Sequence, residues 1–247
     1  MVRTRILGAL KAFVVLSVLG GGAWAFYCYL HESEHWYVQT IRIEGLSRLD
    51  EWTILRQARV TTEDNLLFLD EQAVAERVMA LPYVRQCVVR REFPDTVSIW
   101  IEEREPVATL LHHNRAFAID VEGVAIEELP LSRTRRFPGP FITELPDVDI
   151  VEAGQHIESE SLTDALGVLH AFNSIALAEH VTIAELAARN RNDIRMYCEE
   201  LPFEIRWGRG DYDLQARRLE VLWEYKDRSL DFEQYCDLRF GRDIAAR

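Results

Sequence analysis

Several features that would define a specialised class of protein are scarce in this sequence. Its 247 residues include only four cysteines, eight prolines and 12 glycines, too few for a disulfide scaffold, a proline-rich chain or a collagen-like repeat. Basic residues are also in deficit, because 28 Lys and Arg face 41 Asp and Glu and the net charge is −13. Such a charge opposes binding to nucleic acid. With 48% hydrophobic residues, the chain instead has ample apolar material for a packed core.

Sequence motifs for catalysis and cofactor binding are missing as well. There is no G-x-S-x-G nucleophile turn of a serine hydrolase and no GxxxxGK[ST] phosphate loop. His31 and His35 have the i, i+4 spacing that chelates metals on a helix, but they follow an apolar segment, where solvated polar residues are expected. His112 and His113 should point to opposite faces of a strand and therefore cannot share one ion. We predict a protein that is not an enzyme and that has no cofactor and no metal site.

The densest group of carboxylates consists of Glu102, Glu103 and Glu105. General acid and base catalysis needs two carboxyl groups held in different environments at a set distance. Arg104 and other nearby arginines offer simple surface pairing instead. The sequence therefore predicts a solvated acidic rim at this place.

The most distinctive feature is a long apolar run near the N-terminus. Residues 12–30 contain no charged side chain, and a helix of that length spans about 28 Å, enough to cross the hydrocarbon core of a bilayer. Arg3, Arg5 and Lys11 precede the run, and a basic flank of this kind stays in the cytoplasm. The sequence therefore predicts a cytoplasmic tail at 1–11, a transmembrane helix at 12–30 and an outward-facing remainder.

A cleaved signal peptide is the alternative interpretation of the same segment. Ala23-Trp24-Ala25 has the small-x-small form of a cleavage site. Apolar and aromatic residues continue beyond it through Leu30, as expected for a helix that stays in the membrane. We therefore favour the anchor.

Hydrophobic periodicity beyond the anchor predicts a compact β-α-α-β-β unit. Asp50 and Asp70 are suited to capping two short helices, the second of which ends at Pro82. The first helix covers residues 51–58, and the predicted strands cover 38–44, 84–90 and 96–103. This element order belongs to the α+β class.

Four short sequence motifs lie at the boundaries of these elements. They are Ile41-Arg42-Ile43-Glu44-Gly45, Leu81-Pro82-Tyr83-Val84, Arg90-Arg91-Glu92-Phe93-Pro94-Asp95-Thr96-Val97 and Glu102-Glu103-Arg104-Glu105-Pro106-Val107-Ala108. In this order they resemble a POTRA domain of the FtsQ (DivIB) family of bacterial cell-division proteins. The resemblance implies that a POTRA domain covers residues 36–105.

The remaining sequence predicts a mixed β-sheet with flanking helices. The predicted strands are 107–111, 116–119, 141–144, 194–199, 203–207 and 234–240, and the predicted helices are 162–172 and 214–226. Residues 131–140 lack a period and predict a surface loop.

Three further phrases extend the family resemblance into this second region. They are the D-x-x-G-V pattern at 120–124, Gly208-Arg209-Gly210-Asp211 before a long helix, and Asp237-Leu238-Arg239-Phe240 near the end. The resemblance implies an FtsQ-type β-domain over residues 106–240 and a C-terminal tail at 241–247.

The last predicted strand, 234–240, is a candidate for partner binding. An edge strand has unpaired N–H and C=O groups that can add a strand from another chain. Its alternating residues form two sets, Cys236, Leu238 and Phe240, and Tyr235, Asp237 and Arg239. If the second set faces solvent, it can recognise a partner's side chains. The alternative is an internal strand with Phe240 in the core, and the residues alone leave both interpretations open.

The family resemblance implies a function without catalysis. FtsQ-type proteins are single-pass scaffolds of the divisome, which link early division proteins to septal peptidoglycan synthesis and bind FtsB and FtsL near the C-terminal strand. The positions that match this motif are Asp237, Leu238, Arg239 and Phe240. The resemblance also implies a type II protein of the cell inner membrane that is enriched at the division septum.

The alternative is a POTRA-containing chaperone of envelope transport or assembly. Such proteins normally continue into a β-barrel of many alternating strands. We expect no barrel here, because the chain begins with a helical anchor and ends soon after the predicted sheet.

Overall fold

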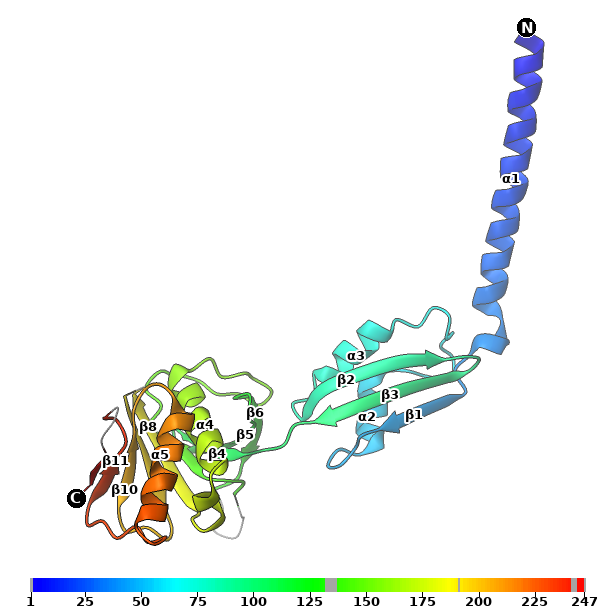
Figure 1. The fold of residues 1–247 in the computed structure, drawn as a ribbon. Coiled ribbons are helices and arrows are strands. Elements are labelled where there is room, and N and C mark those ends of the chain that lie inside the picture. Colours follow the sequence, from blue (N-terminus) through cyan, green and yellow to red (C-terminus); the bar gives the residue numbers. More distant parts are fainter. Residues whose placement is uncertain (1, 132–136, 191, 241–243, 247) are drawn as a thin grey trace. The chain divides into compact units, whose positions relative to one another are not determined.

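The computed structural model describes residues 2–131, 137–190, 192–240 and 244–246. The chain divides into two compact units (Figure 1). The first contains the N-terminal residues through Ala80 and the stretch Val84–Glu103, and the second contains Leu81–Tyr83 and the chain from Arg104 onward.

The N-terminal helix α1 covers Val2–Glu32 and includes the whole predicted apolar segment. Its stretch Phe13–His31 has a mean hydropathy of 1.7, and none of it is buried against the rest of the protein. Among the residues that the structure describes, it is the one helix long and apolar enough to cross a membrane.

The rest of the first unit has the predicted β-α-α-β-β order, which confirms the fold class (Figure 1). Its elements are β1 (Thr40–Glu44), α2 (Glu51–Ala58), α3 (Glu71–Met79), β2 (Val84–Glu92) and β3 (Thr96–Glu103). The sheet order is β1-β3-β2, in which β1 lies parallel and β2 antiparallel to the central strand β3.

Local sequence signals account for this unit. The carboxylate of Asp50 accepts a hydrogen bond from the Thr53 N–H at 2.9 Å, and Asp70 accepts one from the Ala73 N–H at 3.0 Å. Each bond satisfies one free donor at a helix start. The alternating apolar residues of β3 are buried under α2 and α3. They are Val97, Ile99 and Ile101.

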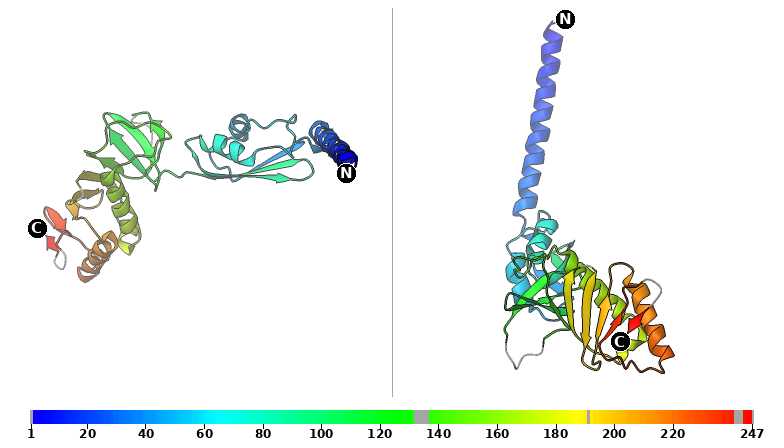
Figure 2. Two further views of the ribbon diagram at one scale, coloured as in Figure 1. Left: turned by 90° about the horizontal axis from the view of Figure 1, so that it is seen from above. Right: turned by 90° about the vertical axis from the view of Figure 1, so that its left-hand side faces the viewer.

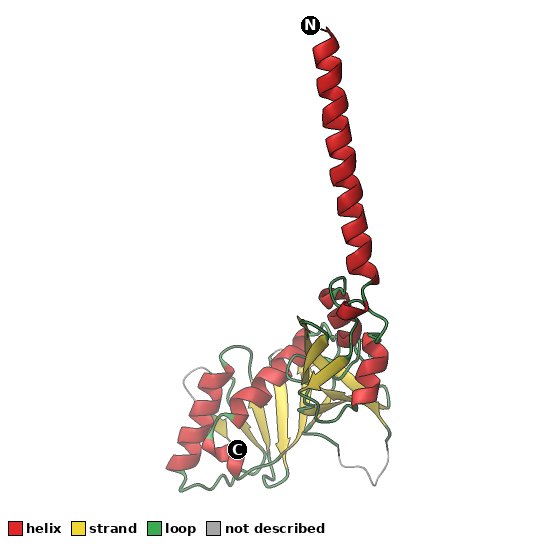
Figure 3. Cartoon of the chain, turned by 90° about the vertical axis from the view of Figure 1, so that its right-hand side faces the viewer, coloured by secondary structure: helices red, strands yellow, loops and turns green. Residues whose placement is uncertain are grey.

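The second unit is a nine-stranded mixed sheet with the order β12-β11-β10-β9-β8-β7-β4-β5-β6. The strands are β4 (Ala108–His112), β5 (Arg115–Ile119), β6 (Ala125–Leu129), β7 (Phe141–Thr143), β8 (Ile183–Asn190), β9 (Asp193–Cys198), β10 (Glu204–Trp207), β11 (Tyr235–Asp237) and β12 (Ala245–Ala246). Parallel pairing occurs between β4 and β7, β7 and β8, and β10 and β11. Helices α4 (Glu160–Asn173) and α5 (Tyr212–Tyr225) pack against the sheet (Figure 2 and Figure 3).

Two predicted features of the second unit need correction. The last predicted strand, 234–240, is limited to Tyr235–Asp237. The sequence prediction also lacked β6, β8 and β12. Residues 183–190 are rich in Ala, Glu and Leu, which favour helix, but pairing with β7 and β9 on both sides makes them a strand. Residues 132–136 of the predicted loop, and 241–243 and 247 of the predicted tail, lie outside the described residues.

Glu103 is not part of a solvated acidic rim, contrary to the sequence prediction. Its carboxylate accepts hydrogen bonds from the backbone N–H groups of Ser47, Arg48 and Leu49 at 3.0, 2.8 and 3.0 Å. Burial alone would raise the pKa of Glu103, but these three donors outweigh it and the pKa lies below its ordinary value of 4.5. The glutamate therefore fastens the loop after β1 to the end of β3.

Replacing Glu103 with glutamine should destabilise the first unit by about 1–3 kcal/mol at neutral pH, because charge-assisted bonds to the loop are lost. A lowered pKa means that the stabilisation is complete above pH 4.5 and fades as the pH falls through the pKa of the folded state. The variant should therefore lose less stability on acidification than the wild type. Thermal unfolding as a function of pH measures this difference. The exposed Glu105→Gln is the matched control, and equal pH profiles for E103Q and wild type would contradict the assignment.

Candidate functional site

The C-terminal strand lies near one end of the nine-stranded sheet. β11 pairs with β10 in parallel, with Ile205 opposite Cys236, and with β12 in antiparallel, with Cys236 opposite Ala246. Within the described residues β12 is the terminal strand of the order, and no strand covers its outer side. The edge at this end of the sheet is therefore the two-residue strand β12, and β11 is the second strand, which agrees with the internal rather than the edge interpretation of that strand.

The predicted partner-binding residues occupy different environments. Asp237 and Leu238 are only 2% and 1% exposed, whereas the side chain of Phe240 is 54% exposed. Tyr235 is half-buried, and the Arg206 guanidinium lies over its ring at 4.3 Å. Neither sequence interpretation describes the strand fully. The strand is paired on both sides, as an internal strand would be, but Phe240 lies outside the core.

The burial of Asp237 has a direct cause in its neighbour. Its carboxylate accepts hydrogen bonds from the backbone N–H of Arg239 at 3.0 Å and from the Arg239 guanidinium at 2.6 to 3.1 Å. Burial alone would raise the pKa of Asp237, but the bonds from Arg239 outweigh it and the pKa lies below its ordinary value. The side chain of Asp237 thus fixes the backbone of Arg239, two residues beyond the end of β11.

Charged side chains of alternating sign cross β9, β10 and the segment after β11. Tyr197 donates a hydrogen bond to Glu204 at 2.9 Å, and Arg239 lies 3.8 Å from Asp193. The full set is Asp193, Arg195, Tyr197, Glu204, Arg206, Asp237 and Arg239. These pairs alternate with buried residues such as Ile194 and Ile205, so they occupy the sheet face opposite the core.

An apolar groove lies on helix α5 beside the same end of the sheet. Leu214, Val221 and Tyr225 are 51%, 63% and 84% exposed, and they follow one another at i, i+7 and i+11 along one face of the helix. Together with Leu222, Ile244, which precedes β12, and the two basic residues Arg217 and Arg218, they line a cavity of about 620 Å³. The opposite face of α5, which includes Leu219 and Trp223, is buried in the core.

Helix α5 and the C-terminal segment are joined by polar contacts. Arg218 donates hydrogen bonds to the carbonyl oxygens of Leu238 at 3.2 Å and Phe240 at 2.7 Å. At the start of the helix, the buried Gln215 side chain donates to the Gly208 carbonyl and accepts from its N–H. A Cβ on Gly208 would lie 3.1 Å from the Arg239 Cα, so glycine permits this close approach. The turn at residues 208–211 and the C-terminal segment 237–240 are thus in contact.

Sequence reasoning missed the exposed face of α5 and the open strand β12. Hydrophobic periodicity places Leu219, Leu222 and Trp223 on one face of the helix, but Leu214, Val221 and Tyr225 form a second apolar stripe, which is exposed. This second stripe was the available signal, because a surface helix normally has one apolar face. Two alanines carry no comparable signal for β12.

The side chains described here offer few groups for chemistry. In the described part of the chain, no three His, Cys, Asp or Glu side chains lie close enough to hold a metal ion. The ring centroids of His112 and His113 lie 4.0 Å apart, which corrects the prediction that they point apart, because His113 has left the strand with a φ of 45°.

All four cysteines are free, and burial raises the pKa of Cys87 to about 11 and that of Cys236 to about 12. These two thiols are therefore protonated at neutral pH and weakly reactive.

Comparison with known proteins agrees with the fold of the first unit and extends the similarity into the second. Residues 37–104 match the POTRA domain, FtsQ-type. The chain is 29% identical to the cell division protein FtsQ of Anaeromyxobacter sp. (strain K), over 85% of this chain and 70% of that protein. It is 24% identical to the cell division protein FtsQ of Syntrophotalea carbinolica, over 99% of this chain and 86% of that protein. Residues 37–104 are therefore an FtsQ-type POTRA domain, and nearly the whole chain is similar to FtsQ-type bacterial cell-division proteins.

Proposed function

We propose that this protein is a noncatalytic single-pass scaffold of the divisome. It links early division proteins to the septal peptidoglycan synthesis machinery through protein–protein contacts. The observation that carries this proposal is the sheet edge at β12, which no strand covers within the described residues, beside an exposed groove on α5. An open edge and an adjacent groove can together bind an extended segment of another protein.

In this proposal the partner is a membrane-anchored division protein similar to FtsB or FtsL. A strand of the partner adds to β12 through backbone hydrogen bonds, and one of its apolar side chains enters the groove beside Tyr225. Asp237 and Leu238 act indirectly, since they are buried and hold the C-terminal segment in place. Tyr235, Arg239 and Phe240 are the accessible residues of the predicted set and contact the partner.

The proposed topology follows from the charge around the apolar segment. Residues 1–11 are cytoplasmic, 12–30 span the cell inner membrane, and the outward part contains the POTRA domain at 36–105, the β-domain at 106–240 and the C-terminal tail at 241–247. The basic residues before the segment favour this type II orientation. The homology to division proteins favours the divisome over an envelope transport chaperone.

An N-terminal fluorescent fusion tests the cellular role. Because partners at the septum would capture the outward domains, the fusion should form a band at midcell in dividing cells. A fusion that carries residues 1–30 alone is the control and should remain spread over the envelope. An even envelope signal from the full-length fusion throughout the cell cycle would refute the divisome role. Release of a small fluorescent fragment would instead identify a cleaved signal peptide.

A further inference from the structure

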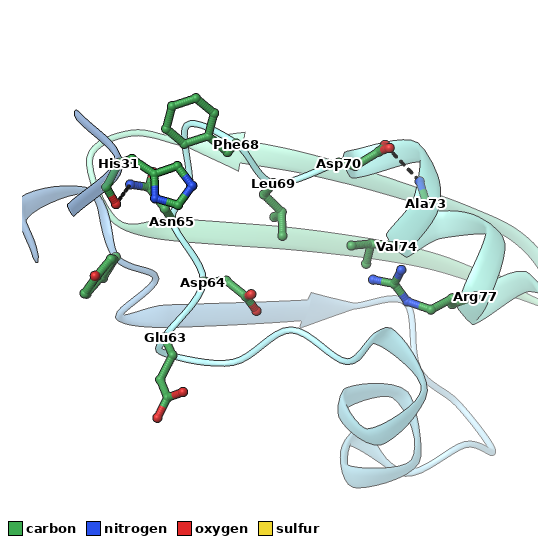
Figure 4. Close-up of a pocket in the computed structure, with 11 residues that line it drawn as sticks. His31, Glu63, Asp64, Asn65, Phe68, Leu69, Asp70, Ala73, Val74 and Arg77 are labelled. Carbon is green, nitrogen blue, oxygen red and sulfur yellow. Dashed lines mark hydrogen bonds between the residues drawn. The ribbon is translucent and has the colours of Figure 1, made fainter. Parts of the chain in front are cut away.

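The first unit binds the outer end of helix α1 through its loop 61–69. The Asn65 side-chain amide donates hydrogen bonds to the carbonyl oxygens of Leu30 at 2.9 Å and His31 at 3.1 Å (Figure 4). These are among the last carbonyls of the helix, which have no partner within it. Asn65 also accepts a hydrogen bond from the Leu67 N–H at 2.9 Å, which holds the amide in position. The loop therefore caps the helix at the point where its apolar segment ends.

Aromatic contacts reinforce this junction. The ring of Phe68 packs edge-on against Tyr27 at 5.5 Å and stacks on His31 at 5.0 Å. Phe68 points away from the strands of the unit, whereas Leu69 and Val74 point toward them (Figure 4). It remains 44% exposed despite these contacts. An apolar ring thus faces outward beside the last turns of α1.

A second exposed ring lies at the same end of the unit. Phe93, in the turn between β2 and β3, is 58% exposed and packs edge-on against Trp36 at 6.0 Å. The Trp36 carbonyl accepts a hydrogen bond from the Leu66 N–H at 2.7 Å, which connects this turn to the loop that caps the helix. Figure 1 shows the β2–β3 turn beside the base of α1. Phe68 and Phe93 therefore belong to one end of the domain.

The helix places this end at the surface of the membrane. The apolar stretch of α1 ends at His31, and Phe68 contacts that residue directly. Aromatic side chains are enriched at exactly such membrane–water boundaries because their rings favour the headgroup level. The loop 61–69 contains Glu63 and Asp64 and no basic residue, and the Arg91 guanidinium that binds its Leu67 carbonyl also pairs with Glu71, so local charge gives little attraction to anionic lipid.

We propose that Phe68 and Phe93 form a membrane-docking surface that enters the headgroup–acyl boundary of the outer leaflet. Hydrophobic insertion into neutral lipid drives the contact, and the contact orients the POTRA domain on the bilayer. The proposal rests on the proposed membrane-spanning role of α1, but it requires no division partner.

The test uses the full-length protein in phosphatidylcholine vesicles with one environment-sensitive fluorophore on an introduced cysteine. Cys28→Ser provides the background, since Cys87, Cys198 and Cys236 are buried. Fluorophores on Phe68→Cys and Phe93→Cys should be quenched by lipids with acyl-chain quenchers at least about threefold more strongly than a control fluorophore. Added anionic phosphatidylglycerol should not increase this quenching.

Trp52→Cys provides the control position. Trp52 is an equally accessible aromatic residue, 64% exposed, at the start of α2. Trp52 and Phe93 lie near opposite ends of β3. The loop before α2 binds Glu103, the last residue of β3, whereas Phe93 lies just before the first residue of β3. The eight residues of β3 separate the two ends by about 26 Å.

A further fluorophore on Val18→Cys separates the docking surface from the anchor. One outcome is that the Val18 fluorophore is quenched, whereas the fluorophores at positions 68 and 93 are quenched no more than the control fluorophore at position 52. This outcome refutes the docking surface while the anchor stands. If the Val18 fluorophore is also unquenched, both the membrane span and the docking surface are refuted. Neither result depends on septal localisation or partner binding, so the test is independent of the divisome role.

Discussion

Replacing Tyr225 and Phe240 together with alanine should weaken binding of an FtsB-like partner by about 700-fold. Aromatic residues at the centre of an interface commonly contribute about 2 kcal/mol each, and about 1.4 kcal/mol corresponds to a tenfold change in affinity. The two side chains are 84% and 54% exposed, so their removal should change the stability of the domain by less than about 0.5 kcal/mol. Titration of the full-length protein in nanodiscs with the labelled partner measures the affinity.

Two control variants distinguish this site from general surface effects. Ile150, in the second unit, is 69% exposed and does not line the groove on α5, and Trp52, in the first unit, is 64% exposed. Ile150→Ala and Trp52→Ala should leave the affinity unchanged. If the Tyr225 and Phe240 variant keeps the circular dichroism spectrum and the affinity of the wild type, the proposed partner site is wrong.

A strand-breaking substitution at Leu238 would be a poorer test of the same site. The Leu238 N–H donates to the Arg206 carbonyl at 2.9 Å, and its side chain is 1% exposed. Proline would remove this hydrogen bond from the residue after β11 to β10 and disturb the core. Lost binding would then report damage to the fold rather than a contact with the partner.

Gly45→Ala should strongly destabilise the first unit. Gly45 has a φ of +90°, and a Cβ at this position would lie 1.9 Å from the Ile101 carbonyl oxygen. A left-handed backbone costs other residues about 1–2 kcal/mol, and overpacking against backbone that cannot move costs about 1–3 kcal/mol more. We therefore expect a loss of about 2–5 kcal/mol. Faster hydrogen exchange of the β3 amides in the full-length protein reports this loss for the first unit alone.

Gly123→Ala separates the two contributions. Gly123 has a similar φ of +79°, but the nearest atom to its Cβ would be the Leu162 Cδ2 at 3.5 Å, an ordinary contact. This control should lose only the backbone contribution of about 1–2 kcal/mol, measured on the amides of β5 and β6. If Gly45→Ala is no more destabilising than Gly123→Ala, the close approach of Gly45 to β3 is not a structural requirement.

The sequence by itself determined the elements whose signals are local. The apolar residues 12–30 form a helix because a helix satisfies its own backbone hydrogen bonds without any other segment. The helices capped by Asp50 and Asp70 begin where the sequence places them, because each cap reaches only three residues ahead. The strand 96–103 was equally predictable, since its alternating apolar residues specify one buried face.

Only the tertiary structure decided the composition of the candidate partner site. Alternation along the last strand leaves it open whether Asp237 faces solvent, and the Arg239 side chain folds back onto its carboxylate so that the residue is buried. β12 exists because β11 supplies a pairing partner, and its two alanines have no strand signal of their own.

The exposed face of helix α5 was likewise decided by tertiary packing. Its sequence contains two apolar stripes, and hydrophobic periodicity cannot say which of them the sheet covers. Packing buries Leu219 and Trp223 and leaves Val221 and Tyr225 exposed. Local hydrogen bonds and periodicity are properties of consecutive residues, whereas an uncovered face or edge depends on which distant segments pack beside it.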